Sequence, residues 1–150
     1  MPERAGPADL DALVALEAAC FDPPRRASRR SLARSLRSPR QEVWVVRDGG
    51  VVAALVVWRH RRLLRIYSLA VLPDRQGSGL GRALVAHAEA MAPGRVVLEA
   101  DVLDGRLVAW YSALGYRVVA ERPDFYGPGR PAVRMEKVTG AAARTAPQPR

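Results

Sequence analysis

The stretch Asp74–Val85, DRQGSGLGRALV, places three glycines and one serine between an apolar run and a segment of helical periodicity. The apolar run before it, residues 63–71 (LLRIYSLAV), ends at Leu72-Pro73 and is typical of a strand. The segment after it, residues 79–91, repeats its apolar side chains every three or four positions. A strand, a glycine loop and a helix N-terminus in this order present free backbone N–H groups to an anion. The sequence therefore predicts a phosphate-binding loop here.

Two common phosphate-binding motifs do not fit this loop. A P-loop needs a lysine followed by serine or threonine, and the chain contains no such pair. The dinucleotide motif Gly-x-Gly-x-x-Gly fails because Arg82 stands where the third glycine belongs. The loop also lies in the middle of the chain, after an antiparallel hairpin. A P-loop is therefore excluded, and a dinucleotide-binding fold is disfavoured.

The rest of the chain predicts a single α/β domain. The expected helices cover residues 7–21, 28–38, 79–91 and 107–114, and the expected strands cover 42–47, 51–59, 63–71, 95–100, 116–120 and 132–138. The turn Asp48-Gly49-Gly50 is the strongest hairpin signal, and RVVLEA (95–100) is apolar on both faces, as in a central strand. This order predicts a mixed, mostly antiparallel central sheet flanked by helices. The domain should span residues 1–138, and the tail 139–150 lacks periodicity and is expected to be disordered.

The chain is strongly basic, with 24 basic and 15 acidic residues, a net charge of +9 and a pI near 11.1. All the basic residues except Lys137 are arginine, which also fits a bias of the coding sequence. Residues 23–41 hold seven arginines and no acid, and a second cluster spans residues 59–65. These clusters are either a solvated face or a site for an anion: a phosphate compound, an acidic substrate or RNA. Nucleic acid is the weaker alternative, because no aromatic side chains are interleaved for stacking.

Composition also bears on compartment and metals. Cys20 is the single cysteine and cannot form an internal disulfide, so a cytoplasmic location is expected. No apolar run approaches the roughly 18 to 20 residues of a membrane span, and the charged N-terminus does not read as a secretory signal. One cysteine with His60 and His87 gives no metal-ligand spacing. Neither a membrane nor a metal is expected.

The loop Gln76-Gly77-Ser78-Gly79-Leu80-Gly81 resembles the Gln/Arg-x-x-Gly-x-Gly/Ala loop of the GNAT superfamily of acyl-CoA-dependent N-acyltransferases. Its surroundings, SLAVLPDRQGSGLGRALVAHAE, resemble that family's strand, loop and helix throughout. LEADVLDGRLVAWYSALGYRVVAERPDFY resembles the strand, helix and LYxxLGF segment that follow. The resemblance covers Leu10 to Val138 and is strongest to ribosomal-protein alanine N-acetyltransferases, through LEAACF, SLAVLPDRQG and Phe125-Tyr126.

The resemblance implies a GNAT fold, acetyl-CoA as co-substrate and an amine acceptor. A protein N-terminus or a lysine is the favoured acceptor, a small-molecule amine stays open, and the protein is expected to be a monomer or homodimer. The implied cofactor-binding residues are Leu69, Ala70, Val71, Gln76, Gly77, Ser78, Gly79, Leu80, Gly81, Arg82 and Asp104. A non-catalytic acyl-CoA-binding module is the alternative, because the loop alone does not establish turnover.

Two further residues are candidates for acid–base chemistry. Glu99 interrupts the buried run Val96-Val97-Leu98, and an acid in a central strand is costly unless it is paired or used. It could be a strand-end carboxylate that reaches solvent or pairs with arginine; the resemblance assigns it the role of base. Tyr111 shares a helical face with apolar neighbours and could be a core residue. The resemblance assigns it the role of general acid, twelve residues after the base.

The sequence departs from the family at three places. Asp104 replaces a usual asparagine, so it could serve only as a helix cap. Asp101 replaces a usual arginine and adds an acid near the site. The segment GPGRPAVRM lacks the acids expected after the aromatic pair, so the acceptor could differ. Among weaker candidates, Glu17 is a helix-edge carboxylate or reaches the acceptor amine, while His87 and Cys20 are expected in the core and His60 on the surface.

Overall fold

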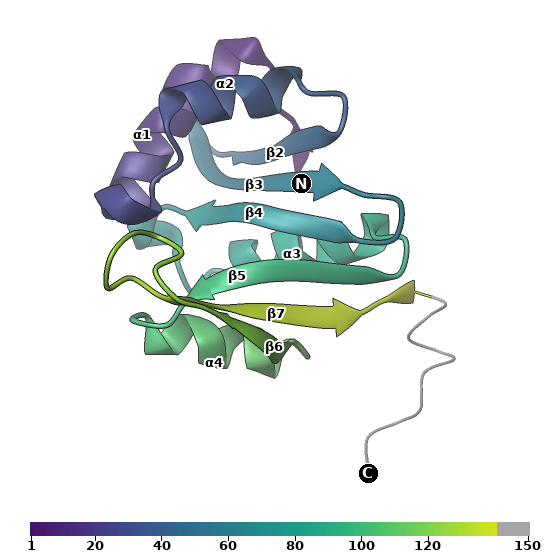
Figure 1. Ribbon diagram of the computed structural model, residues 1–150. Coiled ribbons are helices and arrows are strands. Elements are labelled where there is room, and N and C mark those ends of the chain that lie inside the picture. The colour runs from purple at the N-terminus through teal and green to yellow at the C-terminus, as the bar shows by residue number, and fades with distance from the viewer. Residues whose placement is uncertain (141–150) are drawn as a thin grey trace.

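The computed structural model describes residues 1–140 of the chain. Seven strands form one sheet in the order β1-β2-β3-β4-β5-β7-β6 (Figure 1). The strands are β1 (Glu3–Arg4), β2 (Gln41–Arg47), β3 (Val51–Arg59), β4 (Leu64–Val71), β5 (Arg95–Asp101), β6 (Arg117–Arg122) and β7 (Ala132–Val138). Only β4 and β5 pair in parallel; the other neighbours are antiparallel. The predicted mixed, mostly antiparallel sheet is confirmed, and β5 is central as expected.

The helices begin and end where the sequence supplies caps. They are α1 (Leu10–Cys20), α2 (Arg29–Arg37), α3 (Leu80–Met91) and α4 (Gly105–Ala113). The Ser28 hydroxyl accepts a hydrogen bond from the Ser31 N–H at 3.0 Å, which caps α2. Asp104 accepts from the Leu107 N–H at 3.3 Å and caps α4, while Gly115, with φ of 100°, follows its end. The cap at Asp104 was expected from the sequence.

Several boundaries differ from the prediction. The first expected helix divides into a short 3₁₀ turn, Pro7–Asp9, followed by α1. The last helix begins at Gly105, two residues early, because Asp104 takes the cap position. The two-residue strand β1 was not predicted, since so short an edge strand has no periodicity to detect. Of the tail 139–150, only residues 139 and 140 belong to the described part, so the prediction of disorder lies almost entirely outside it. No helix within residues 1–140 combines the length and apolarity that crossing a membrane requires.

The sheet separates two apolar clusters. Under α3 and α4, one face is filled by side chains including Leu55, Ile66, Leu84, Leu98 and Met135. Under α1 and α2, the opposite face buries a smaller cluster that includes Leu13, Leu16, Leu32, Val45 and Val56. In Figure 1, α1 and α2 lie over the β2–β4 part of the sheet, which leaves the neighbouring part of that face to loops. Successive strand residues alternate between the two faces.

The parallel pair β4–β5 is where the sheet opens. Pairing runs from Leu64 opposite Val96 to Ile66 opposite Leu98 and then stops, although both strands continue. At the same place the register between β3 and β4 shifts, because Tyr67 is an extra residue opposite Val56 and Val57. Such a bulge bends its strand and increases the local twist. The second half of β4 therefore pairs with β3 alone and has one free edge.

Candidate active site

The glycine loop follows the free half of β4. Gly77 and Gly79 adopt φ of 82° and 91°, a backbone conformation that side chains with a Cβ rarely take. Gly79 is the N-cap of α3 and no side chain caps this end, so the first N–H groups of the helix have no acceptor within residues 1–140. Residues 76–79 are exposed. The loop thus presents backbone donors and the positive end of a helix dipole to the exterior.

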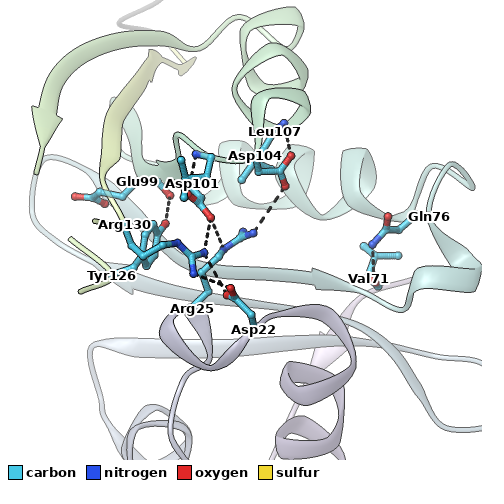
Figure 2. Close-up of polar contacts among 11 residues, drawn as sticks. Asp22, Arg25, Val71, Gln76, Glu99, Asp101, Asp104, Leu107, Tyr126 and Arg130 are labelled. Carbon is cyan, nitrogen blue, oxygen red and sulfur yellow. Dashed lines mark hydrogen bonds and ion pairs between the residues drawn. The ribbon is translucent and has the colours of Figure 1, made fainter. Parts of the chain in front are cut away.

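The remaining loop residues have structural contacts. The Gln76 side chain donates to the Val71 carbonyl at 3.2 Å (Figure 2), and the Ser78 hydroxyl donates to the Arg75 carbonyl. Gly81 lies in the first turn of α3, where a Cβ would come within 3.3 Å of the Trp110 ring on α4. A larger residue here would require the Trp110 ring to shift by a few tenths of an ångström, so Gly81 allows close packing of α3 on α4, which the loop pattern alone does not reveal.

The backbone N–H groups on the free edge of β4 belong to Leu69 and Val71. The Leu72 N–H bonds the Val52 carbonyl at 2.9 Å, so in this antiparallel pair the N–H of Ala70 also points toward β3. The N–H groups of Leu69 and Val71 therefore point away from β3, toward the side on which β5 has separated. Of the three strand residues expected to contact a cofactor through their backbone, these two are free to do so.

Glu99 lies on β5 with its side chain only 5% exposed and carries two ion pairs. Arg65 Nη2 is 2.9 Å from Oε2, and Arg134 Nε is 3.5 Å from Oε1. Arg134 stands directly opposite Glu99 in the β5–β7 register, and Arg65 is diagonal to it across β4–β5. The pairing with arginine that the sequence left open is present, and the carboxylate also lines both cavities described below. The two arginines were missed, although each interrupts an apolar strand as Glu99 does.

Tyr111 reaches the same place from the opposite face of the sheet. Tyr111 is 4% exposed and packs in the apolar cluster under α3 and α4. The interpretation of Tyr111 as a core residue therefore holds for its ring. Leu98 belongs to that cluster, so its neighbour Glu99 faces the other side. The two candidates nevertheless line one small cavity of about 60 Å³ at the point where β4 and β5 separate. Burial raises the pKa of Tyr111, which keeps its hydroxyl protonated at neutral pH.

Tyr126 also lies at the candidate site, although the sequence marks it only through the resemblance carried by Phe125-Tyr126. It lines both cavities, and its hydroxyl donates to the Glu99 carbonyl at 3.4 Å (Figure 2). Burial raises the pKa of Tyr126 to about 12. It comes from the loop between β6 and β7, so only the tertiary fold brings it to Glu99.

A second, larger cavity of about 380 Å³ lies on the α1–α2 side of Glu99. Glu17 lines it from α1, is 5% exposed, and accepts hydrogen bonds from the Ala27 N–H at 2.6 Å and the Ser68 hydroxyl at 3.0 Å. Burial raises the pKa of Glu17, although both hydrogen bonds act against this. The interpretation of Glu17 as a helix-edge carboxylate is therefore wrong, because the loop after α1 folds back over it.

A cluster of ion pairs connects the segments around the site (Figure 2). Arg130, from the β6–β7 loop, pairs with Asp22 at 2.6 Å and with Asp101 at 3.0 Å. Arg25 lies 3.7 Å from the carboxylates of both Asp101 and Asp104. Asp101, the acid that replaces the family's usual arginine, is 2% exposed. Its ion pairs with Arg25 and Arg130 join the end of β5 to the segment after α1 and to the β6–β7 loop. The Asp104 carboxylate is shared between its cap and Arg25, and no contact tests its expected role toward a cofactor.

The weaker candidates lie apart from this arrangement. His87 is partly buried against Trp44, with ring centroids 4.3 Å apart, and His60 is exposed beside Trp58. The Cys20 thiol donates to the Val71 carbonyl at 3.2 Å, and burial raises its pKa to about 11. Within residues 1–140, no group of three or more His, Cys, Asp or Glu side chains is placed to hold a metal ion.

Comparisons with known proteins agree with this architecture. The sequence model of the acetyltransferase (GNAT) domain matches residues 39–118. The ribosomal-protein-S18-alanine N-acetyltransferase of Escherichia coli has a TM-score of 0.83 at 21% identity, over 99% of each chain. Ard1 of Thermoplasma volcanium has a TM-score of 0.81 at 19% identity, over 93% of this chain and 97% of its own. Arabidopsis thaliana NAA60 in complex with acetyl-CoA gives 0.76 at 15% identity, over 92% and 97%. A comparison with curated proteins gives no significant match.

At such identities the solved structures bear on the fold alone. The domain match is a sequence-level finding and covers more than half of the chain, including the glycine loop, the diverging strands and both Glu99 and Tyr111. The chain belongs to the GNAT acetyltransferase family.

Proposed function

We propose that this protein transfers an acetyl group from acetyl-CoA to an amine by direct attack. The observation that carries the proposal is the separation of β4 and β5 beyond Ile66 and Leu98, which opens the sheet between the glycine loop and the cavity of Glu99 and Tyr111. A thioester placed along this opening would have anion donors at one end and an acid–base pair at the other. The single cysteine supports the expectation of a reducing, cytoplasmic setting.

The residues present fit acetyl-CoA. The uncapped N–H groups from Gly79 to Arg82 are suited to its pyrophosphate, and the backbone of Leu69 and Val71 offers the free strand edge that a pantetheine amide would pair with. When bound, acetyl-CoA supplies an activated acyl group. An N–H of the β4 edge would then donate to the negative charge that develops on the carbonyl oxygen, a contact commonly worth about 10²–10³ in rate.

Glu99 and Tyr111 divide the proton transfers in this proposal. Glu99 receives the proton of the attacking amine, directly or through a water, because its carboxylate lines both the larger cavity and the small one. Tyr111, protonated at neutral pH, donates to the departing sulfur. A positioned acid or base typically contributes about 10²–10⁴ in rate. The amine enters through the larger cavity, beneath the segment that follows α1.

The first test is a thermal-shift titration with acetyl-CoA, CoA and NAD. A ligand at about 100 times its Kd adds about 2.7 kcal/mol to stability. We expect shifts with both CoA species and none with NAD. The absence of a shift with acetyl-CoA would contradict the proposal at its first step.

The second test compares two tyrosines at the same cavity by measuring thiol release with an amine acceptor. We expect Tyr111→Phe to lower kcat by about 10² or more, with the Kd of acetyl-CoA unchanged, because only the proton donor is removed. The matched variant Tyr126→Phe should lose much less. The reverse order would make Tyr126 the acid. A protein that binds acetyl-CoA but releases no thiol with any amine would instead be a non-catalytic binding module.

A further inference from the structure

The larger cavity carries more positive charge than its own acids neutralise. Its charged lining consists of Arg25, Arg26, Arg34, Arg65, Glu17 and Glu99. Both carboxylates are engaged within the protein, Glu99 by Arg65 and Arg134 and Glu17 by hydrogen bonds. Arg26 and Arg34 form no ion pair with any residue of 1–140, and Arg26 donates to the carbonyls of Phe21 and Ala18. Arg25 pairs with Asp101 and Asp104, so the uncompensated charge on this wall is that of Arg26 and Arg34.

The excess charge continues along α2 as a stripe. Arg30, Arg34 and Arg37 recur at intervals of four and three residues, so they share one side of the helix. Like charges at this spacing destabilise a helix by a few tenths of a kcal/mol each, on the order of 0.2–0.5. Residues 23–41 contain no acid to offset this cost. By contrast, Arg29 lies on another side of α2, and its charge is compensated by an ion pair with Asp11.

The stripe is too long for a small acceptor. Seven residues of helix rise about 10 Å at 1.5 Å per residue. Arg34 lines the cavity, whereas Arg30 and Arg37 lie about one turn away on either side of it and outside its lining. A small amine held beside Glu99 would not span this distance. An extended polypeptide whose terminal amine enters the cavity would pass along the helix.

We propose that the acceptor is a polypeptide with acidic residues just after its reacting N-terminal amine, and that the α2 stripe (Arg30, Arg34 and Arg37) binds those acids. This inference rests on the proposed acyl transfer and names its substrate class. Arginine recognises carboxylates by charge-assisted hydrogen bonds, and exposed arginines raise the rate of encounter with an anionic ligand.

The test uses two synthetic peptides that share their first two residues and differ by glutamate or glutamine at the next four. We expect kcat/KM, followed by thiol release at about 50 mM salt, to be about tenfold higher for the acidic peptide. The difference should shrink at about 300 mM salt, because exposed charges are screened. Arg34→Gln should remove most of the preference, because it should lower kcat/KM for the acidic peptide more than for the glutamine peptide. Arg30→Gln should do so in part.

Arg62→Gln is the matched control, since it removes the same charge from an exposed residue of the β3–β4 turn that makes no ion pair within residues 1–140. Equal rates for the two peptides, or a preference that survives Arg34→Gln, would overturn the inference.

Fluorescence anisotropy with the same peptides, labelled at their C-termini, measures binding without turnover. Tighter, Arg34-dependent binding of the acidic peptide supports the stripe as the binding surface for that peptide. If no amine of any class releases thiol, the proposed function fails, and this binding result still stands. Stronger binding of a single-stranded RNA oligonucleotide would assign the stripe to nucleic acid and overturn the proposal.

Discussion

The two faces of the sheet differ in whether they carry charged side chains. The face under α3 and α4 is apolar from β2 to β7, and Leu98 at its centre is 1% exposed. On the opposite face, α1 and α2 cover only part of the sheet, and Glu99, Arg65 and Arg134 take the positions beside them. Adjacent residues of one strand thus face a packed apolar cluster on one side and a charged cavity on the other. The two faces meet where β4 and β5 separate, because Tyr111 and Glu99 line one cavity at that point.

The sharpest test of this comparison substitutes two neighbouring residues of β5, each in a separate variant. Glu99→Gln should lower kcat by about 10²–10⁴, because an amide cannot take the proton of the amine, while it keeps an oxygen that Arg65 can donate to. Leu98→Ala should instead lower the free energy of unfolding by about 2–5 kcal/mol, because it leaves a cavity in the packed cluster. Thiol-release kinetics and denaturant unfolding separate the two outcomes.

Each member of this pair is the control for the other. Acetyl-CoA affinity should survive Glu99→Gln, and the specific activity of the folded fraction should survive Leu98→Ala. If Glu99→Gln reduced affinity and rate equally, Glu99 would be a structural carboxylate and its ion pairs the whole of its role.

The sequence predicts the parts of the site that depend on local geometry. The glycines of the loop, the cap Asp104 and the hairpin at Asp48-Gly49-Gly50 were all located, because φ preferences and capping act within a few residues. Glu99 was singled out as a candidate because an acid within an apolar strand is unusual, and its catalytic role stays a prediction. Its partners were not, since Arg65 and Arg134 reach it only through the β4–β5 and β5–β7 registers. The same holds for Tyr126, which a long loop carries to β5.

The bulge at Tyr67 is a further feature that the residues alone do not mark. Neither glycine nor proline is present in LLRIYSLAV, so nothing local distinguishes the paired half of β4 from the free half. The opening of the sheet is thus a property of how β4 lies between β3 and β5.

A smaller effect is expected at the ion pairs that hold loops over the cavity. Asp101→Asn should lower the Tm by several degrees, because it leaves Arg130 and Arg25 without their most buried partner. It should also raise KM for the acceptor more than for acetyl-CoA, since the segments it joins border the larger cavity. Differential scanning fluorimetry and initial rates at varied acceptor concentration measure both quantities.

Asp22→Asn is the matched change in the same cluster. The Asp22 side chain is 50% exposed, and exposed pairs contribute little to stability, so its Tm should stay close to that of the unmodified protein. Equal losses from Asp22→Asn and Asp101→Asn would show that burial does not distinguish the two ends of this cluster.

The smallest effect concerns Glu17, the acid that the cavity face buries without an ion pair. Because burial raises its pKa in the folded state above the ordinary value of 4.5, the folded protein binds this proton more readily than the unfolded chain. The contribution of Glu17 to stability is therefore greatest below about pH 4.5 and declines as pH rises through the raised pKa. Glu17→Gln is neutral throughout and keeps both hydrogen bonds, since the Ser68 hydroxyl can accept instead of donate. The Tm of Glu17→Gln relative to the unmodified protein should thus increase steadily from about pH 4 to about pH 7.

Ser68→Ala removes one hydrogen bond that opposes the upward shift of the Glu17 pKa, so the stability of this variant should fall more steeply over the same pH range. A difference that is flat with pH would mean that Glu17 titrates as an exposed carboxylate and that the segment after α1 does not stay closed over it in solution.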